Sequence, residues 1–258
     1  MKRGSLIIAL LFTLLLCQQN AEAQAVRIAS GTTDSIGFRA NAYTLRYQRL
    51  IVPAVLIGYG VIGLKNEGLK ELNRSTRDEI LEDRPGRTTW DNYTQYAPAL
   101  MVYGFNAAGL EGWHRFKERT LIYATSQLIS TAFVVPLKRF THVERPDGSN
   151  FESFPSGHTA TAFSSAHFLF REYKDSNIWL SLSGYPLAIF TGVYRTINNK
   201  HWVSDVVAGA GFGILSTEMA YWLYPKMRNL VAKRPDKTAT VWMPTYQNGM
   251  GIALTHHF

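Results

Sequence analysis

Six apolar segments stand out in the pattern of hydrophobic and polar positions along the chain. They lie at residues 51–64, 96–110, 121–137, 159–170, 178–194 and 206–224. Strand-like alternation is largely absent from them and small residues recur at helical spacing, so each segment predicts a helix. The 258 residues include no linker-like stretch in the middle of the chain and suffice for one large core. We therefore predict an all-α fold, a six-helix bundle over residues 51–225.

Two further patterns predict elements outside these six segments. An amphipathic pattern over Glu67–Leu81 predicts another helix, which ends near the break signal Arg84-Pro85-Gly86. Near the end of the chain, apolar and β-branched stretches flank Asn248-Gly249, which is a two-residue turn signal. We therefore predict that residues 226–258 form a basic tail and a short β-hairpin.

The first 23 residues have the layout of a secretory signal peptide. A basic start precedes an apolar run from Leu6 to Leu16, and small residues at Ala21 and Ala23 have the spacing of a cleavage site. Cleavage after Ala23 would leave residues 24–50 as an N-terminal extension and remove Cys17, the one cysteine of the chain. The mature chain would then hold no disulfide. We expect an exported protein of the bacterial cell envelope, associated with the membrane and with its site in the periplasm.

Whether the apolar helices span a bilayer stays open at the level of sequence. A span needs about 20 apolar residues, and most of these runs are shorter and include Gln127, His167 or Glu218. Three full spans after a cleaved signal would place residues 138–158 on the cytoplasmic side. The basic stretch at 225–235, in contrast, suits a cytoplasmic end of the chain. These two signals conflict, so a soluble helical bundle and an integral one both remain.

The formal net charge of +8 favours anionic partners without selecting one. Basic residues are interspersed with acidic ones, as in residues 65–87, and no compact cluster of aromatic and basic residues is present. We expect no nucleic-acid partner. No set of Asp, Glu or His has the spacing of a metal site, so we expect neither a metal nor another cofactor. The oligomeric state cannot be read from the sequence.

Three polar clusters fall where the predicted helices begin or end. They are Lys138 with Arg145 after the third segment, Ser156, Gly157 and His158 before the fourth, and Arg195, His201 and Asp205 between the fifth and sixth. Each cluster alone is typical of a solvated helix end or an ordinary cap. In an antiparallel bundle, however, all three lie at the same end, where cations and imidazoles would surround one anion.

The chemistry of these residues agrees with an anion site. A serine cap at Ser156 directs free backbone N–H groups and the helix dipole at whatever lies in front, and Gly157 permits close approach. His201 and Asp205 are four residues apart, so on a helix the carboxylate could accept a hydrogen bond from one ring nitrogen. The other nitrogen would be left as a nucleophile or base.

These clusters resemble the three-part signature of the type-2 phosphatidic acid phosphatase superfamily, which includes bacterial acid phosphatases and vanadium haloperoxidases. The signature reads K-x6-R-P, P-S-G-H and S-R-x5-H-x3-D, and here it falls at residues 138–146, 155–158 and 195–205. One position departs from it, since Tyr194 stands where the family has Ser. The larger side chain of Tyr194 would change the pocket wall beside Arg195.

The resemblance implies metal-independent hydrolysis of a phosphomonoester through a phosphohistidine. His201 would be the nucleophile, Asp205 would orient it, and His158 would be the general acid and base. Phosphate would be bound by the remaining signature residues, namely Lys138, Arg145, Ser156, Gly157 and Arg195. His167 is interpreted as a core histidine among apolar neighbours. The sequence names no partner for His114 or His142.

Four functions follow from this pattern. The first is removal of phosphate from an envelope lipid: lipid A, phosphatidylglycerophosphate, phosphatidate or undecaprenyl pyrophosphate. The second is a soluble periplasmic acid phosphatase, which the cleaved signal and short apolar runs favour. Vanadate-dependent halide oxidation is the third, and a non-enzymatic structural role is the fourth. The presence of every catalytic residue type argues against the last.

Overall fold

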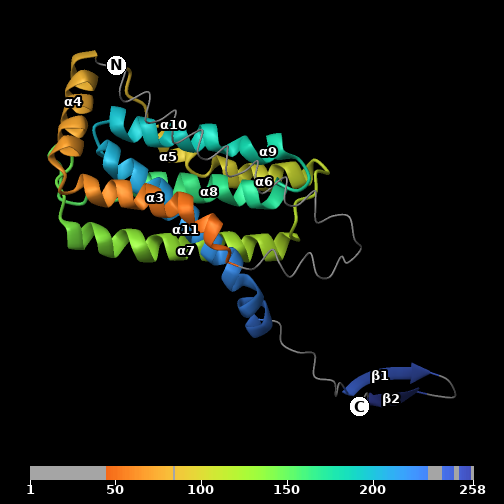
Figure 1. Ribbon diagram of the computed structural model, residues 1–258. Helices are drawn as coiled ribbons and strands as arrows, with labels where there is room; N and C mark the ends of the chain where they lie inside the picture. Colours follow the sequence, from red (N-terminus) through yellow and green to blue (C-terminus); the bar gives the residue numbers. More distant parts are fainter. Residues whose placement is uncertain (1–44, 84, 232–239, 247–249, 257–258) are drawn as a thin grey trace. The chain divides into compact units, whose positions relative to one another are not determined.

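The computed structural model describes residues 45–83, 85–231, 240–246 and 250–256 (Figure 1). The predicted signal peptide, Cys17 and residues 24–44 lie outside the described residues. The chain divides into two units, Met1–Trp222 and Leu223–Phe258. The described part of the first unit is helical apart from its connections, which confirms the all-α prediction.

Every predicted apolar segment is helical. The described helices are α3 (Tyr47–Gly63), α4 (Glu67–Asp83), α5 (Asp91–Thr94), α6 (Ala97–Ala107), α7 (Phe116–Thr141), α8 (Gly157–Tyr173), α9 (Ile178–Leu182), α10 (Gly184–Ile197) and α11 (Val203–Val231). The fifth predicted helix is in two pieces, α9 and α10. Pro186 has no N–H to donate to the preceding turn, so one helical hydrogen bond is missing at the boundary between α9 and α10.

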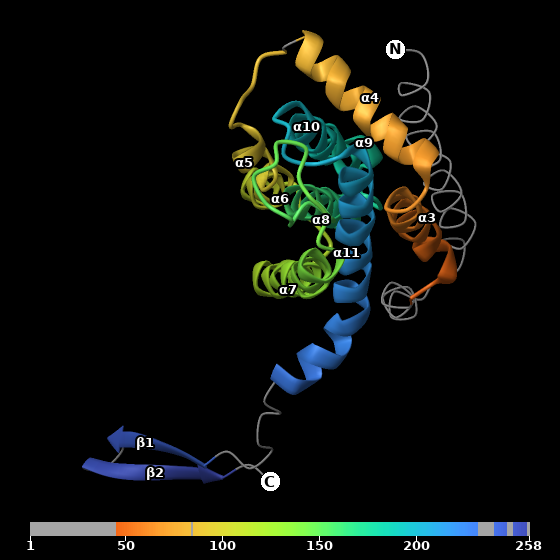
Figure 2. The same cartoon turned by 90° about the vertical axis from the view of Figure 1, so that its left-hand side faces the viewer.

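Helix α8 lies at the centre of the first unit. Helices α6, α7 and α10 pack against it, and Figure 2 shows α11 beside it, with α3 on the outer side of α11. Glycines on α11 make these approaches possible. A Cβ on Gly209 would lie 2.5 Å from the carbonyl oxygen of Ser156, and a Cβ on Gly211 would lie 2.9 Å from that of Pro53. Close packing of α11 therefore fixes the start of α8.

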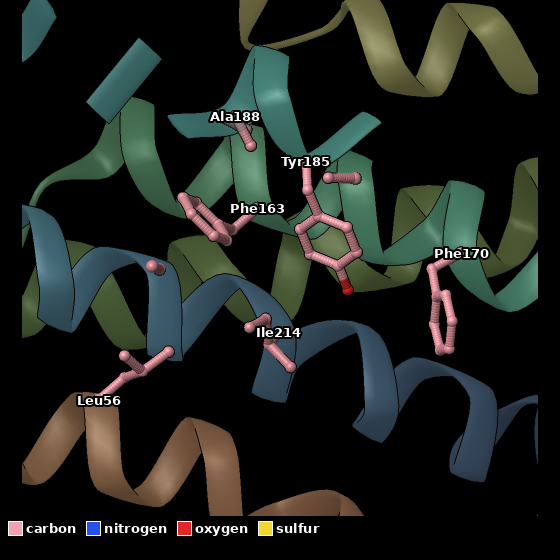
Figure 3. Packing of buried hydrophobic residues seen from close by; sticks show 9 residues of the cluster. Leu56, Phe163, Phe170, Tyr185, Ala188 and Ile214 are labelled. Carbon is pink, nitrogen blue, oxygen red and sulfur yellow. The ribbon is translucent and has the colours of Figure 1, made fainter. Parts of the chain in front are cut away.

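The core joins four helices in one apolar cluster (Figure 3). Leu56 of α3 and Ile214 of α11 face Phe163 and Phe170 of α8 and Tyr185 of α10. Each of these side chains is at most 8% exposed. Burial of one such side chain contributes about 1.5–3 kcal/mol. The chain has one cysteine, Cys17, and so cannot form a disulfide within itself. This packing therefore holds the bundle together.

The amphipathic helix predicted at Glu67–Leu81 is confirmed as α4. It is bent by 88° from α3. Asn73 is the buried residue of α4: its side chain donates to Ser204 Oγ over 2.9 Å and accepts from the Ser204 backbone N–H over 3.2 Å. This reciprocal pair attaches α4 to the first turn of α11.

The second unit contains the predicted hairpin. Strand β1 (Thr240–Tyr246) pairs antiparallel with β2 (Met250–His256), with Thr240 opposite His256 and Tyr246 opposite Met250. The predicted turn at Asn248-Gly249 lies outside the described residues.

Two of the described helices are long and apolar enough to cross a membrane. They are α7 over its whole length, Phe116–Thr141, and α11 over Val203–Arg228. A third crossing exists by the same measure if the bent pair α3 and α4 counts as one span. Length and composition thus support the predicted membrane association, and they favour spanning helices, which the sequence alone left open.

Candidate active site

The predicted site residues lie at one end of the bundle, where α7 and α10 end and α8 and α11 begin. The backbone N–H of Ser156 donates to the carbonyl of Asp205 over 3.0 Å, which joins the start of α8 to the start of α11. The backbone N–H of His201 donates to the carbonyl of Arg195 over 3.3 Å. A Cβ on Gly157 would lie 4.0 Å from Cε of Lys138 at the end of α7. Segments far apart in the sequence are therefore neighbours here.

His201 is buried with one ring nitrogen fixed by the backbone. Its Nδ1 lies 2.8 Å from the carbonyl oxygen of Ser153. A carbonyl can only accept, so Nδ1 carries the proton and Nε2 keeps its lone pair. Burial lowers the pKa of His201 to about 4, although the nearby Asp205 carboxylate opposes this shift. The ring is therefore neutral at pH 7, which is the form that a nucleophile requires.

Asp205 does not accept the close hydrogen bond from His201 that the four-residue spacing suggested. Its Oδ2 is 3.7 Å from Nδ1 of His201, and it accepts instead from Ser153 Oγ at 2.5 Å and from the Trp202 backbone N–H at 2.9 Å. The physical reason is that α11 begins at Val203. His201 precedes the helix, so the two side chains are not stacked on one helical face. Ser153 provides the nearer acceptor.

The start of α8 has the predicted serine cap. Ser156 is buried, and its Oγ accepts from the Thr159 backbone N–H over 3.5 Å and from the Thr159 hydroxyl over 2.9 Å. Lys138 reaches the same region and donates to the carbonyl of Glu152 over 2.6 Å. The cap and the ammonium group thus both lie at the positive end of the α8 dipole.

Two guanidinium groups bring further positive charge to this end. Arg195 is 8% exposed, and its Nη1 donates to Asp91 Oδ2 over 2.9 Å. Desolvation and the charge of Arg195 both lower the pKa of Arg145. The Nε atoms of Arg145 and Arg195 are buried without a hydrogen-bond partner among the residues that the structure describes. Such donors, held close to a like charge, favour an anion.

His158 is half-buried at the first turn of α8. Its Nε2 lies 2.9 Å from Oδ1 of Asn92. Burial, together with the positive charge of Arg195, lowers the pKa of His158 to about 4, while Asp91 acts in the opposite direction. A bound phosphate dianion would add negative charge here and would raise this pKa again.

Three residues that contact the predicted site were missed from the sequence. Ser153 acts partly through its backbone carbonyl, which carries no residue-specific signal. Asp91 and Asn92 directly precede an apolar helix, which is the usual place of an ordinary helix start. Nothing in the pattern of the sequence separates that role from a place in the site.

The interpretation of His167 as a core histidine among apolar neighbours was wrong about its surroundings. Its Nδ1 lies 2.8 Å from the hydroxyl of Tyr185, and its Nε2 lies 2.7 Å from a carboxylate oxygen of Glu218. His114 is also buried, with Nδ1 2.6 Å from Glu172. Both belong to polar contacts away from the site. Among the described residues, no group of three or more His, Cys, Asp or Glu could hold a metal ion.

Comparison with known proteins agrees with the three-part signature. Residues 119–229 match the PAP2 superfamily, and this stretch contains all three clusters. Residues 119–229 therefore form a domain of the PAP2 superfamily.

Individual relatives are named as phosphatases of lipid A. A lipid A 1-phosphatase of Porphyromonas gingivalis is 33% identical over 181 residues, which cover 70% of this chain and 38% of that protein. A lipid A 1-phosphatase of Rhizobium johnstonii is 33% identical over 91 residues, 34% of each chain. The chain thus spans well under half the length of these relatives.

Among solved structures, LpxE of Aquifex aeolicus is similar at 22% identity and a TM-score of 0.43, over 58% of this chain and 92% of that one. A transmembrane PAP2-type phosphatidylglycerolphosphate phosphatase of Bacillus subtilis is similar at 20% identity and a TM-score of 0.43, over 70% of this chain and 98% of that one.

Proposed function

We propose that this protein is a metal-independent phosphatase that removes a phosphate from an envelope lipid through a phosphohistidine at His201. One observation carries the proposal. The buried Nε donors of Arg145 and Arg195 lie at the same end of the bundle as two neutral histidines. The positively charged groups bind the phosphate, and the two imidazoles act as the nucleophile and the proton carrier.

In the first step, the lone pair of His201 Nε2 attacks phosphorus and the bond from phosphorus to the lipid oxygen breaks. The imidazole becomes cationic as the P–N bond forms. The Ser153 carbonyl holds its Nδ1–H, and the Asp205 carboxylate, 3.7 Å away, stabilises the charge. His158, protonated in the complex with the dianion, gives its proton to the departing alkoxide.

In the second step, neutral His158 takes a proton from water as the water oxygen attacks phosphorus. The P–N bond breaks and its electron pair returns to Nε2 of His201. Inorganic phosphate leaves, and both histidines regain their starting forms. Lys138, Arg145 and Arg195 bind the phosphoryl oxygens in both steps, together with the backbone amides at Ser156 and Gly157.

Lipid A carrying a 1-phosphate is the substrate that we propose first. The relative that aligns with 70% of this chain is named a lipid A 1-phosphatase. The two apolar helices long enough to span would keep the site at a lipid surface. This second observation favours a lipid over the small organic phosphates of a soluble acid phosphatase.

The test is release of inorganic phosphate by the chain purified in detergent. Lipid A, phosphatidylglycerophosphate, phosphatidate, undecaprenyl pyrophosphate and a water-soluble phosphomonoester serve as parallel substrates. We expect hydrolysis of lipid A at the 1-position to exceed the others, and His201→Ala to lower the rate on the order of a thousandfold or more. Labelled substrate should leave an acid-labile, base-stable phosphoenzyme that His201→Ala does not form.

His142→Asn is the matched control, because His142 is exposed, contacts the ring of Phe151 and has the left-handed φ of 49° that Asn tolerates. It should retain activity. Full activity of His201→Ala would sink the mechanism. Equal rates on the soluble ester and the lipids would instead favour a soluble-type acid phosphatase.

A further inference from the structure

Helix α5 is attached to the end of α10 by a ladder of polar contacts. Figure 2 shows the two helices side by side. Two residues of α10 and its C-cap residue lie along one face of the helix. Each of the three forms a hydrogen bond with one residue of α5 or of the segment before it. The pairs are Thr191 with Thr94 at 2.8 Å, Arg195 with Asp91 at 2.9 Å, and Asn198 with Thr88 at 2.8 Å. Because this ladder holds α5 in one register, the next side chain, Asn92, has a fixed place.

Asn92 uses that place to contact the histidine at the start of α8. Its amide oxygen lies 2.9 Å from Nε2 of His158. An amide oxygen only accepts, so the contact requires the proton of neutral His158 to be on Nε2. Nδ1 is then the ring nitrogen that exchanges a proton with the substrate.

We propose that Asn92 is a positioning residue that fixes the ring and the tautomer of His158 for proton transfer through Nδ1. This inference rests on the proposed function, in which His158 is the general acid and base. It adds a residue that lies outside the three-part signature and outside residues 119–229, which match the family. Asn92 itself is exposed and touches His158 without contributing charge.

The neutrality of Asn92 suits the charges around His158. Arg195 from α10, Lys138 from α7 and His201 from the segment before α11 all disfavour the protonated ring, and Asp91 favours it. An amide in the place of Asn92 can orient the ring without changing this balance. A carboxylate in that place would hold the proton on His158 more strongly.

The first test reads the tautomer directly and needs no turnover. In protein labelled with ¹⁵N-histidine, the ring signals of His158 are assigned by their loss in His158→Ala. We expect the Nε2-protonated form in the parent chain and a mixture of both tautomers in Asn92→Ala. In the same variant we expect kcat to fall about tenfold, as for loss of one orienting hydrogen bond, while KM stays within about twofold.

The second test uses Asn92→Asp and the pH dependence of kcat. The added carboxylate should raise the pKa of His158. The limb of the profile on which His158 must be protonated should therefore move to higher pH, by about one unit. A role limited to holding the fold would lower activity at all pH values and would leave this limb in place.

Asn177→Ala is the matched control, since it removes an amide that caps α9 by accepting from the Leu180 backbone N–H and belongs neither to the ladder of α5 nor to the site. Its tautomer signal and pH profile should equal those of the parent chain. An unchanged tautomer in Asn92→Ala, or an unmoved limb in Asn92→Asp, overturns the inference. If His158→Ala hydrolyses lipid at the full rate, the proposed function itself is wrong. The tautomer measurement needs no turnover, so it tests the contact between Asn92 and His158 independently of that result.

Discussion

At the scale of single residues, the buried neutral state of His201 links the site to stability. The ring is 2% exposed and its pKa is lowered to about 4, whereas an unfolded chain has a histidine pKa of about 6.5. As the pH falls from 6.5 to 4, the unfolded chain binds a proton that the folded chain refuses. Stability is therefore present above pH 6.5 and is lost as the pH falls, on the order of 3 kcal/mol from this residue.

Replacing His201 by Gln should remove that part of the acid sensitivity. We expect the thermal midpoint of the parent chain in detergent to fall between pH 7 and pH 4 more steeply than the midpoint of His201→Gln. Scanning calorimetry or tryptophan fluorescence at several pH values measures both. Parallel curves for the two proteins would contradict a neutral, buried His201.

Arg195 illustrates a second residue-scale requirement, the shape of a cation. One side of its guanidinium donates to Asp91, and its Nε remains for another acceptor. Lysine presents a compact charge without this fork. We expect Arg195→Lys to lower kcat/KM about a hundredfold. Arg139→Lys, the same exchange at an exposed position of α7, should change it less than twofold.

The site could be predicted from sequence as far as its side chains follow fixed spacing. The charged and imidazole groups of the three clusters lie together as antiparallel helices imply. The hydrogen bond to His201 could not be predicted, because its acceptor is the backbone of Ser153. The contact of Asn92 depends on tertiary placement of a single helical turn, which no local pattern encodes.

At the scale of elements, the approach of α11 to α8 sets the position of the site. Gly209 faces the carbonyl of Ser156, the cap residue of α8, and a Cβ there would lie 2.5 Å from that oxygen. Backbone atoms cannot move aside cheaply. We expect Gly209→Ala to cost about 1–3 kcal/mol by overpacking and to lower phosphatase activity, because the start of α8 must shift.

Gly58→Ala is the control for that exchange. Gly58 lies inside α3, and no neighbouring atom is within 4 Å of a Cβ placed there. This variant should be as stable as the parent or gain about 0.5–1 kcal/mol from the lower entropy of the unfolded chain. Thermal unfolding in detergent compares the two variants. Equal stability of Gly209→Ala and Gly58→Ala would mean that α11 and α8 are not in close contact.

Element prediction succeeded where the apolar period was long and failed where an element was short. The six apolar runs gave helices because their faces must be buried or covered by lipid. The break between α9 and α10 lies just before Pro186, and the apolar composition of that run concealed it, whereas Pro136 and Pro225 lie inside continuous helices. Helix α5 has four residues and is polar, so its position depends on α10 and not on its own pattern.

At the scale of the whole first unit, the direction of α7 and α11 relates the site to the membrane. Helix α7 runs toward the site, which lies near its end at Lys138, and α11 runs away from it, beginning beside Asp205. Only 22% of the most apolar 18-residue stretch of α7 is buried inside the protein. Its outward face includes Leu128 at 72% exposure. An apolar helix with so little protein cover fits a lipid environment.

The sidedness of α7 follows from its length and can be measured with single cysteines. Its 26 residues extend about 39 Å, more than the roughly 30 Å of a hydrocarbon core, so its two ends should lie on opposite sides. Phe140, near the site, and Phe116, at the other end, are 87% and 65% exposed.

In a Cys17→Ser background, we expect an impermeant maleimide to label Phe140→Cys from the periplasmic side. Phe116→Cys should react only after the inner membrane is opened. Labelling of both from outside would show that α7 does not span, and the reverse order would place the site in the cytoplasm.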